Sequence, residues 1–136
     1  MSESKLYLGI DPGRSKTGLA LVDEAGEIIK LRVAVTADLA AEIAEFTKGV
    51  SLCRVVMGNG TNSANVAQIA QQVLADLPLT VVKEAHSTEE ARKLYWQVNP
   101  PAGWRRLMPL GMLVPPVPLD AYAAVILVRR HLAQNK

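Results

Sequence analysis

The sequence predicts an α/β protein with one mixed, five-stranded sheet and helices on both faces. Three short apolar segments at the start of the chain are joined by brief turns, which predicts an antiparallel meander. Two further apolar runs then alternate with segments of helical periodicity. This alternation is typical of β-α-β units, in which a helix connects two parallel strands. A length of 136 residues supplies one domain with a genuine core. We therefore expect residues 1–136 to form a single domain.

The strands of the meander are expected at residues 5–11, 17–23 and 27–35. The first ends at a proline and a glycine, which force a turn because proline fixes φ and glycine tolerates positive φ. The second and third are joined by Asp23-Glu24-Ala25-Gly26, a short turn ending in glycine that favours an antiparallel hairpin. We expect the first strand to lie in the centre of the sheet.

Helices and two further strands alternate after the meander. They are expected at 38–48 (helix), 55–57 (strand), 61–76 (helix), 79–83 (strand), 88–97 (helix) and 119–133 (helix). In the helices, apolar residues recur at spacings of three and four, which gathers them on one face. Asp38 is expected to cap the first helix, and Gly49 to end it. Ser87 and Glu90 have the spacing of a capping box for the third helix.

Composition excludes several classes of protein. A hydrophobic share of 49% and a charged share of 21% are those of a soluble globular protein. No stretch approaches the roughly 18 apolar residues of a membrane span, and the polar N-terminus lacks a signal-peptide core. The single cysteine, Cys53, excludes an internal disulfide and fits a reducing compartment. We expect a cytoplasmic protein without a membrane partner, either a monomer or a homodimer.

The segment 98–118 is rich in proline and also apolar. Its six prolines rule out a regular helix. Its many leucines, methionines and valines make it too apolar for a simple solvent-exposed linker. Two interpretations remain open: a flexible flap or partner-binding loop, and a loop folded onto the protein's own core.

Positive charge is concentrated in the last third of the chain. Residues 91–136 hold seven basic residues and one acid, whereas residues 1–50 hold six basic and eight acidic residues. Tyr95, Trp96 and Trp104 lie among these charges, and aromatic faces beside cations can stack on bases while the cations meet phosphates. This pattern favours a nucleic-acid partner. A solvated basic surface with aromatic core residues is the alternative.

Three carboxylates could meet at one edge of the sheet. Asp11 ends the first strand, Glu84 follows the last strand, and Asp120 begins the closing helix. Sites form outside the carboxyl ends of parallel strands, and adjoining carboxylates repel one another unless a cation is present. Such oxygen ligands select Mg²⁺ or Mn²⁺. The alternatives are an Asx-turn at Asp11, a surface residue at Glu84 and a helix-terminal residue at Asp120.

Three segments resemble motifs of the RuvC and YqgF/RuvX branch of the RNase H-like superfamily. Leu8-Gly9-Ile10-Asp11-Pro12-Gly13-Arg14, with Thr17-Gly18-Leu19-Ala20, is similar to its first motif. The run from Val82 to Ala91 is similar to the second acidic motif of YqgF-type proteins, and the run from Asp120 to Leu127 to their closing helix. The resemblance implies an RNase H-like fold with Asp11, Glu84 and Asp120 as metal-binding catalytic acids. It implies a nuclease that resolves Holliday junctions or matures ribosomal RNA precursors.

Basic and polar residues around these motifs are candidate contacts to nucleic acid. They are Arg14, Lys16, Asn59, His86, Arg92, Lys93, Arg105 and Arg106. His86 could hydrogen-bond a phosphate or shuttle a proton, or simply lead into the helix.

Two other functions remain open beside a metal-dependent endonuclease. YqgF-type proteins usually have an arginine after the second acid, where this chain has Ala85 and His86, and Asp120 lacks the acidic neighbour of RuvC-type enzymes. A nucleic-acid-binding relative with weak or no cleavage is therefore the second hypothesis. The Gly-Ile-Asp-x-Gly loop also resembles the phosphate loop of actin-like ATPases and sugar kinases, which need two such domains. A phosphate-binding domain of that type is the third.

Overall fold

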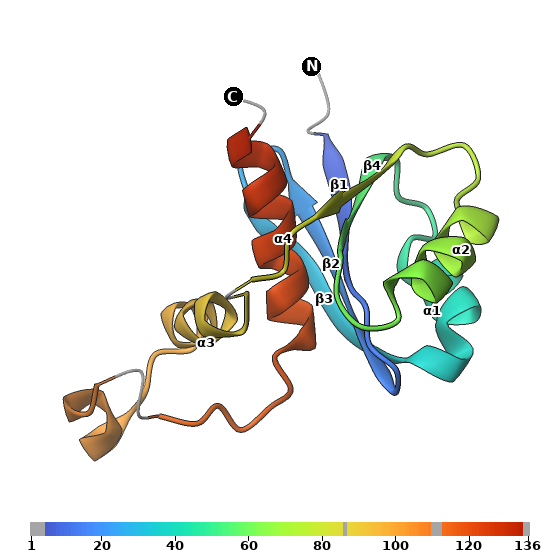
Figure 1. Ribbon diagram of the computed structural model, residues 1–136. Helices are drawn as coiled ribbons and strands as arrows, with labels where there is room; N and C mark the ends of the chain where they lie inside the picture. The colour runs from blue at the N-terminus through green and yellow to red at the C-terminus, as the bar shows by residue number, and fades with distance from the viewer. Residues whose placement is uncertain (1–4, 86, 110–112, 135–136) are drawn as a thin grey trace.

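Five strands form one mixed sheet in the order β3-β2-β1-β4-β5, seen in a computed structural model of the chain (Figure 1). The structure describes residues 5–85, 87–109 and 113–134, apart from the side chains of Arg105 and Arg106. The meander consists of β1 (Leu6–Asp11), β2 (Lys16–Asp23) and β3 (Ile28–Val35), and each successive pair is antiparallel. β1 also pairs in parallel with β4 (Leu52–Gly58), which pairs in parallel with β5 (Leu79–Val82). The predicted fold class and the central position of the first strand are confirmed.

Four helices cover the two faces of the sheet. α1 (Leu39–Phe46) and α2 (Ser63–Val73) lie on one face, and α4 (Asp120–Gln134) lies on the other with α3 (Ser87–Val98) beside it (Figure 1). Two short 3₁₀ helices, η1 (Thr36–Asp38) and η2 (Gly103–Leu107), complete the described elements. No helix in the described part of the chain is both long and apolar enough to cross a membrane.

The side chains of β1 and β2 alternate between the two faces because successive residues in a strand point in opposite directions. Leu8, Ile10, Leu19 and Leu21 belong to the core beneath α1 and α2. Ala20 and Val22 belong to the core beneath α3 and α4. The sheet is therefore buried on both faces, which leaves its carboxyl edge for chemistry.

Several predicted boundaries need correction. β4 begins at Leu52 rather than at residue 55, because pairing with Leu6 of β1 extends the strand. α2 begins only at Ser63, because Asn62 has a left-handed φ of 66° that no α-helix contains. Asp38 occupies the N-cap of α1 without a capping hydrogen bond from its side chain. Ser87 is the first residue inside α3 rather than its cap, so the capping-box prediction is wrong.

The proline-rich segment is partly folded and partly exposed. Leu113 is buried against Tyr95 and Trp96 of α3, whereas Leu107 and Val114 are each 85% exposed. The burial of Tyr95 and Trp96 agrees with the alternative that these aromatic residues belong to the core. Of Tyr95, Trp96 and Trp104, only Trp104 is well exposed, at 69%.

Candidate active site

Asp11 is the last residue of the central strand, and the turn behind it is held from three directions. Thr36 Oγ1 donates a hydrogen bond to the Gly13 carbonyl at 3.0 Å, and Asn62 Nδ2 donates to the same oxygen at 3.2 Å. The Gly13 N–H donates to Thr17 Oγ1 at 3.4 Å, and the buried hydroxyls of Thr17 and Thr36 are 2.9 Å apart. β2, η1 and the start of α2 therefore fix the backbone that follows the carboxylate. Sequence reasoning missed these residues because their contacts span up to 49 positions.

Glu84 reaches the same edge from the end of β5. Its carboxylate occupies space that is open only because residues 58 and 60 are glycines. A Cβ on Gly58 would lie 2.2 Å from Glu84 Oε1, and one on Gly60 would lie 1.9 Å from Oε2. Because β1 and β4 are paired in parallel with Ile10 opposite Met57, Gly58 lies beside Asp11. The two glycines thus admit the Glu84 carboxylate to the neighbourhood of Asp11.

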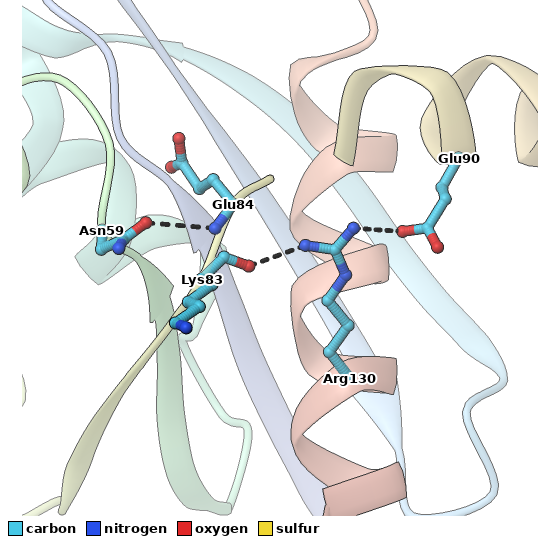
Figure 2. Close-up of polar contacts among 5 residues, drawn as sticks. All are labelled: Asn59, Lys83, Glu84, Glu90 and Arg130. Carbon is cyan, nitrogen blue, oxygen red and sulfur yellow. Dashed lines mark hydrogen bonds and ion pairs between the residues drawn. The ribbon is translucent and has the colours of Figure 1, made fainter. Parts of the chain in front are cut away.

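The backbone of Glu84 is anchored on both sides of the strand exit. Asn59 Oδ1 accepts a hydrogen bond from the Glu84 N–H at 3.1 Å. On the other side, Arg130 of α4 donates to the Lys83 carbonyl at 2.7 Å and forms an ion pair with Glu90 of α3. Figure 2 shows the Glu84 side chain pointing away from this guanidinium. Arg130 is a positioning residue that the sequence did not reveal, since it lies 47 residues from Lys83.

Asp120 is brought to the edge by the close seating of α4 on the sheet. Gly18 is the partner of Asp11 across the β1–β2 pair, and a Cβ on Gly18 would lie 1.9 Å from the Asp120 carbonyl oxygen. One turn further along, a Cβ on Gly9 would lie 2.5 Å from the Ala124 carbonyl oxygen. In both cases the nearest atom is a backbone carbonyl oxygen of α4, which cannot move aside as a side chain can. Only glycine at position 18 therefore allows α4 to begin directly above the strand partner of Asp11.

The electrostatics of Asp11 show that the acids influence one another. Its pKa is raised from 3.8 to about 8, first by burial and then by the charge of Glu84 and a hydrogen bond with its carboxyl group. The charge of Asp120 raises it further. Glu84 Oε1 is buried and has no hydrogen-bond partner among the described residues. Within that same part of the chain, however, no three acidic, histidine or cysteine side chains stand as a ready set of metal ligands.

The candidate nucleic-acid contacts are distributed unevenly around this edge. Arg14 is exposed on the turn that follows Asp11, and Lys16 is exposed at the start of β2. Asn59 is exposed, but its side-chain oxygen accepts the hydrogen bond from the Glu84 N–H. His86 lies outside the described residues, as do the side chains of Arg105 and Arg106 on η2.

The two basic residues of α3 have different surroundings. Arg92 is half-buried. Lys93 is exposed and lines a groove of about 350 Å³ between α3 and α4 together with Arg129 and Arg130. Arg130 is ten residues beyond Asp120, or about 15 Å along the helix. Because Arg130 also binds the Lys83 carbonyl at the exit of β5, the groove that Lys93 lines lies beside the backbone of Glu84, although far along α4 from Asp120.

A mixed sheet of this order, with helices on both faces, is an RNase H-like fold. Among solved structures, the chain is similar to T. thermophilus RuvC in complex with a Holliday junction substrate. The TM-score is 0.59 at 14% identity, and the match covers 96% of this chain and 95% of that one. At this identity the likeness shows the fold.

Partial likenesses to larger proteins also occur. A ROK family transcriptional regulator, described as a homolog of the E. coli MLC protein, matches with a TM-score of 0.49 and 18% identity over 68% of this chain. A ROK family glucokinase from Streptomyces griseus, in complex with glucose and AMPPNP, matches with a TM-score of 0.47 and 19% identity over 64% of this chain. The chain spans only 31% and 36% of these two proteins. No protein-family model matches the sequence, and no curated protein does.

Proposed function

We propose that this chain is a metal-dependent endonuclease that cleaves structured nucleic acid, either a four-way DNA junction or a ribosomal RNA precursor, in the manner of RuvC- and YqgF-type proteins. One observation carries the proposal: the pKa of Asp11 is raised to about 8, first by burial and then by its interactions with Glu84 and the charge of Asp120. A carboxyl group whose pKa is raised in this way is costly to ionise in the fold, and a cation beside it would remove that cost.

The chemistry of the acids at this edge suits a divalent cation, although their side chains do not yet stand as a set of three ligands among the described residues. Asp11, Glu84 and Asp120 would hold Mg²⁺ or Mn²⁺, and the buried Glu84 Oε1 lacks any other partner among the described residues. Carboxylate oxygens are the ligands that these ions prefer. When bound, such ions activate water and stabilise the leaving oxygen of a phosphodiester.

The surrounding residues have supporting roles in this proposal. Asn59 and Arg130 hold the backbone at Glu84, and the hydroxyls of Thr17 and Thr36 hold the turn behind Asp11. Arg14, on the turn that follows Asp11, and Lys16, at the start of β2, are exposed and would bind the phosphates that flank the cleaved bond. The similar protein RuvC is recorded with a Holliday junction, which favours a branched DNA substrate over an unstructured one.

Cleavage of four-way junctions, duplexes and precursor RNA in Mg²⁺ or Mn²⁺ tests the proposal. Asp11→Asn, Glu84→Gln and Asp120→Asn should each reduce cleavage by orders of magnitude, because each removes a charge from one metal site. Asp76→Asn is the matched control, since Asp76 is exposed in the turn beyond the end of α2. Equal cleavage by wild type and Asp11→Asn, or undiminished cleavage in EDTA, would overturn the proposal.

A nucleic-acid-binding protein with weak or no cleavage is the second candidate. It is favoured by the absence, among the described residues, of three side chains already arranged as metal ligands. In that case the protein would bind junctions or RNA with a steep salt dependence, because phosphate neutralisation releases counterions. Arg14→Ala combined with Lys16→Ala should lower both the affinity and the salt slope, while no divalent ion yields cleaved product.

A further inference from the structure

The groove between α3 and α4 carries more positive than negative charge. It has a volume of about 350 Å³, and its α3 wall holds Glu90, Lys93 and Gln97, all of which are exposed. Their spacing of three and four residues places them on one face of the helix. Arg129 and Arg130 stand on the opposite wall, formed by α4. Among the described lining residues, three cations therefore face one carboxylate.

The two arginines of this α3–α4 groove are positioned by backbone carbonyl groups. Arg129 Nε donates to the Gly26 carbonyl at 3.0 Å. Arg130 donates to the Lys83 carbonyl at 2.7 Å and pairs with Glu90 (Figure 2). A neutral carbonyl fixes a guanidinium without cancelling its charge, and one such bond uses only one of its five N–H donors. The arginines are thus held in place while remaining able to bind an anion.

Lys93 and Arg129 are the cations of the groove that lack an acidic partner. Within the described part of the chain, neither side chain forms an ion pair with a carboxylate. Cations of like sign on one concave surface reinforce one another's field and concentrate anions there. The groove is therefore suited to a negatively charged ligand.

The two sides of the groove have different surroundings. The guanidinium of Arg130 contacts the residue before Glu84, so one side lies next to the candidate active site. On the other side, Arg129 also lines a hollow that contains Glu24 and Glu27, in the turn between β2 and β3. These acids would repel a polyanion. A negatively charged chain in the groove is therefore directed toward the acidic edge and not across the hairpin.

The length of the groove suits the backbone of a nucleic-acid strand. From Glu90 to Gln97 the α3 wall spans about 10 Å. This length corresponds to about three nucleotides of one strand, at a rise of about 3.4 Å each. Phosphate oxygens accept hydrogen bonds from guanidinium groups and are attracted to the point charge of a lysine.

We propose that the α3–α4 groove binds about two or three successive phosphates of the nucleic-acid strand that enters the acidic edge. Lys93 and Arg129 bind the phosphates, and Gln97 donates to a phosphate oxygen. The inference rests on the proposed function, because it takes nucleic acid as the substrate, and it adds the path that one strand follows away from the acids. Phosphate contacts fix register and orientation, so the groove determines which phosphodiester bond reaches Asp11 and Glu84.

The test measures binding of a fluorescent four-way DNA junction in EDTA over a series of salt concentrations, so that neither metal nor cleavage contributes. Lys93→Gln removes one charge and keeps a good helix former. Its affinity at about 0.1 M salt should fall about fivefold, and the slope of log Kd against log salt should decrease by about one. Lys48→Gln is the matched control, because Lys48 is exposed beyond α1 on the opposite face of the sheet, and it should bind like wild type.

A second pair of variants adds negative charge. Gln97→Glu places a carboxylate on the α3 wall and should weaken junction binding about fivefold. Gln72→Glu should not, although Gln72 is also exposed and both glutamines are the last but one residue of their helices. Because a new carboxylate meets the same helix-end dipole in both variants, a difference in affinity reports an anion in the groove. Equal affinity within both pairs of variants overturns the proposal.

Single methylphosphonate substitutions along the junction strands then locate the groove on the substrate. Each substitution removes the charge of one phosphate. About two or three consecutive positions should weaken binding by wild type but not by Lys93→Gln. If every position has the same effect on both proteins, Lys93 contacts no phosphate and the proposal fails.

The outcomes separate this inference from the nuclease proposal. A protein that cleaves junctions, but binds them equally well as wild type and as Lys93→Gln, refutes the groove alone. A protein whose binding depends on Lys93 but that never cleaves in Mg²⁺ or Mn²⁺ refutes the nuclease alone. If Lys93→Gln loses binding of inorganic phosphate while its junction affinity is unchanged, the groove belongs to a small anion and the proposal is overturned.

Discussion

The two faces of the sheet are packed in different ways. The face beneath α1 and α2 is filled by large side chains such as Leu39, Ile43 and Phe46. The face beneath α4 instead has glycines at positions 9 and 18, and α4 meets it with a run of alanines. Large side chains keep a helix at a distance, whereas glycine lets backbone approach backbone. The face that carries Asp120 is thus the one where a helix lies closest to the sheet.

This difference in packing indicates which face of the sheet tolerates amino-acid substitutions. Large aliphatic side chains can be shortened with a graded loss of packing. A glycine against a carbonyl oxygen has no smaller substitute, and any larger residue must displace the helix. We therefore expect mutations on the α1–α2 face to change stability alone, and mutations on the α4 face to change stability and activity together.

Gly18→Ala should have the largest effect. The added methyl group would lie 1.9 Å from the Asp120 carbonyl oxygen, so α4 must move and carry Asp120 away from Asp11. We expect a loss of about 3 kcal/mol in stability and a fall of about 100-fold in cleavage, measured by urea unfolding and junction cleavage. Gly49→Ala is the control: it meets nothing within 4 Å but has a φ of +74°, so it should cost about 1 kcal/mol and leave cleavage intact. Equal behaviour of the two variants would contradict the comparison.

Asp11→Asn should stabilise the metal-free protein at high pH. Because the folded pKa of Asp11 is about 8 and its ordinary value is 3.8, the folded state binds the proton more tightly. The resulting stability is fully present below pH 3.8 and is lost as pH rises to about 8. Asparagine removes this loss, so the midpoint of thermal unfolding at pH 8 in EDTA should rise by about 5 °C. The gain should vanish near pH 4, and a gain of the same size at both pH values would argue against a perturbed carboxyl group.

Arg130→Gln should have an intermediate effect that involves both stability and metal use. Loss of the contacts to Lys83 and Glu90 should cost about 1.5 kcal/mol and raise the Mn²⁺ concentration needed for half-maximal cleavage by about tenfold, because the backbone at Glu84 is less well held. Arg32→Gln is the counterpart on the other face, where Arg32 lies 3.9 Å from Glu42 and from Glu45. Such exposed pairs contribute little, so this variant should cleave like wild type across the whole Mn²⁺ titration.

Ile43→Val should have the smallest effect. It removes one methylene group from the fully buried core beneath α1 and should cost about 1 kcal/mol. Cleavage per folded molecule should equal that of wild type at the same Mn²⁺ concentration. A change in its metal requirement would show that the two faces are coupled, contrary to our expectation.

Much of the fold was predictable because it depends on local patterns. Apolar periodicity located the five strands and four α-helices of the described residues, and the Asp23–Gly26 turn predicted the hairpin. The errors fell where pairing or backbone conformation overrides such patterns. β4 is extended by its pairing with β1, and α2 is shortened by the left-handed Asn62.

The site was predictable only in part. The positions of Asp11, Glu84 and Asp120 at element ends suggested that they converge, and the charge coupling at Asp11 agrees with this. The residues that hold them in place could not be found, because Arg130, Asn62 and Thr36 act through contacts with residues at least 23 positions away. The burial of Trp96 was equally hidden, since a tryptophan among basic residues suits a core and a binding surface alike.

The space that Glu84 occupies offers a way to find the same arrangement in other sequences. Neither Gly58 nor Gly60 has a positive φ that would require glycine. The space that their side chains would fill is instead occupied by the Glu84 carboxylate, 26 and 24 residues later in the chain. A sequence search could require both glycines at the end of one strand and an acid at the end of the next. Such a pattern would select sequences by this local geometry and not by overall sequence similarity. It would separate sequences able to bring the two carboxylates together from those that merely share the fold.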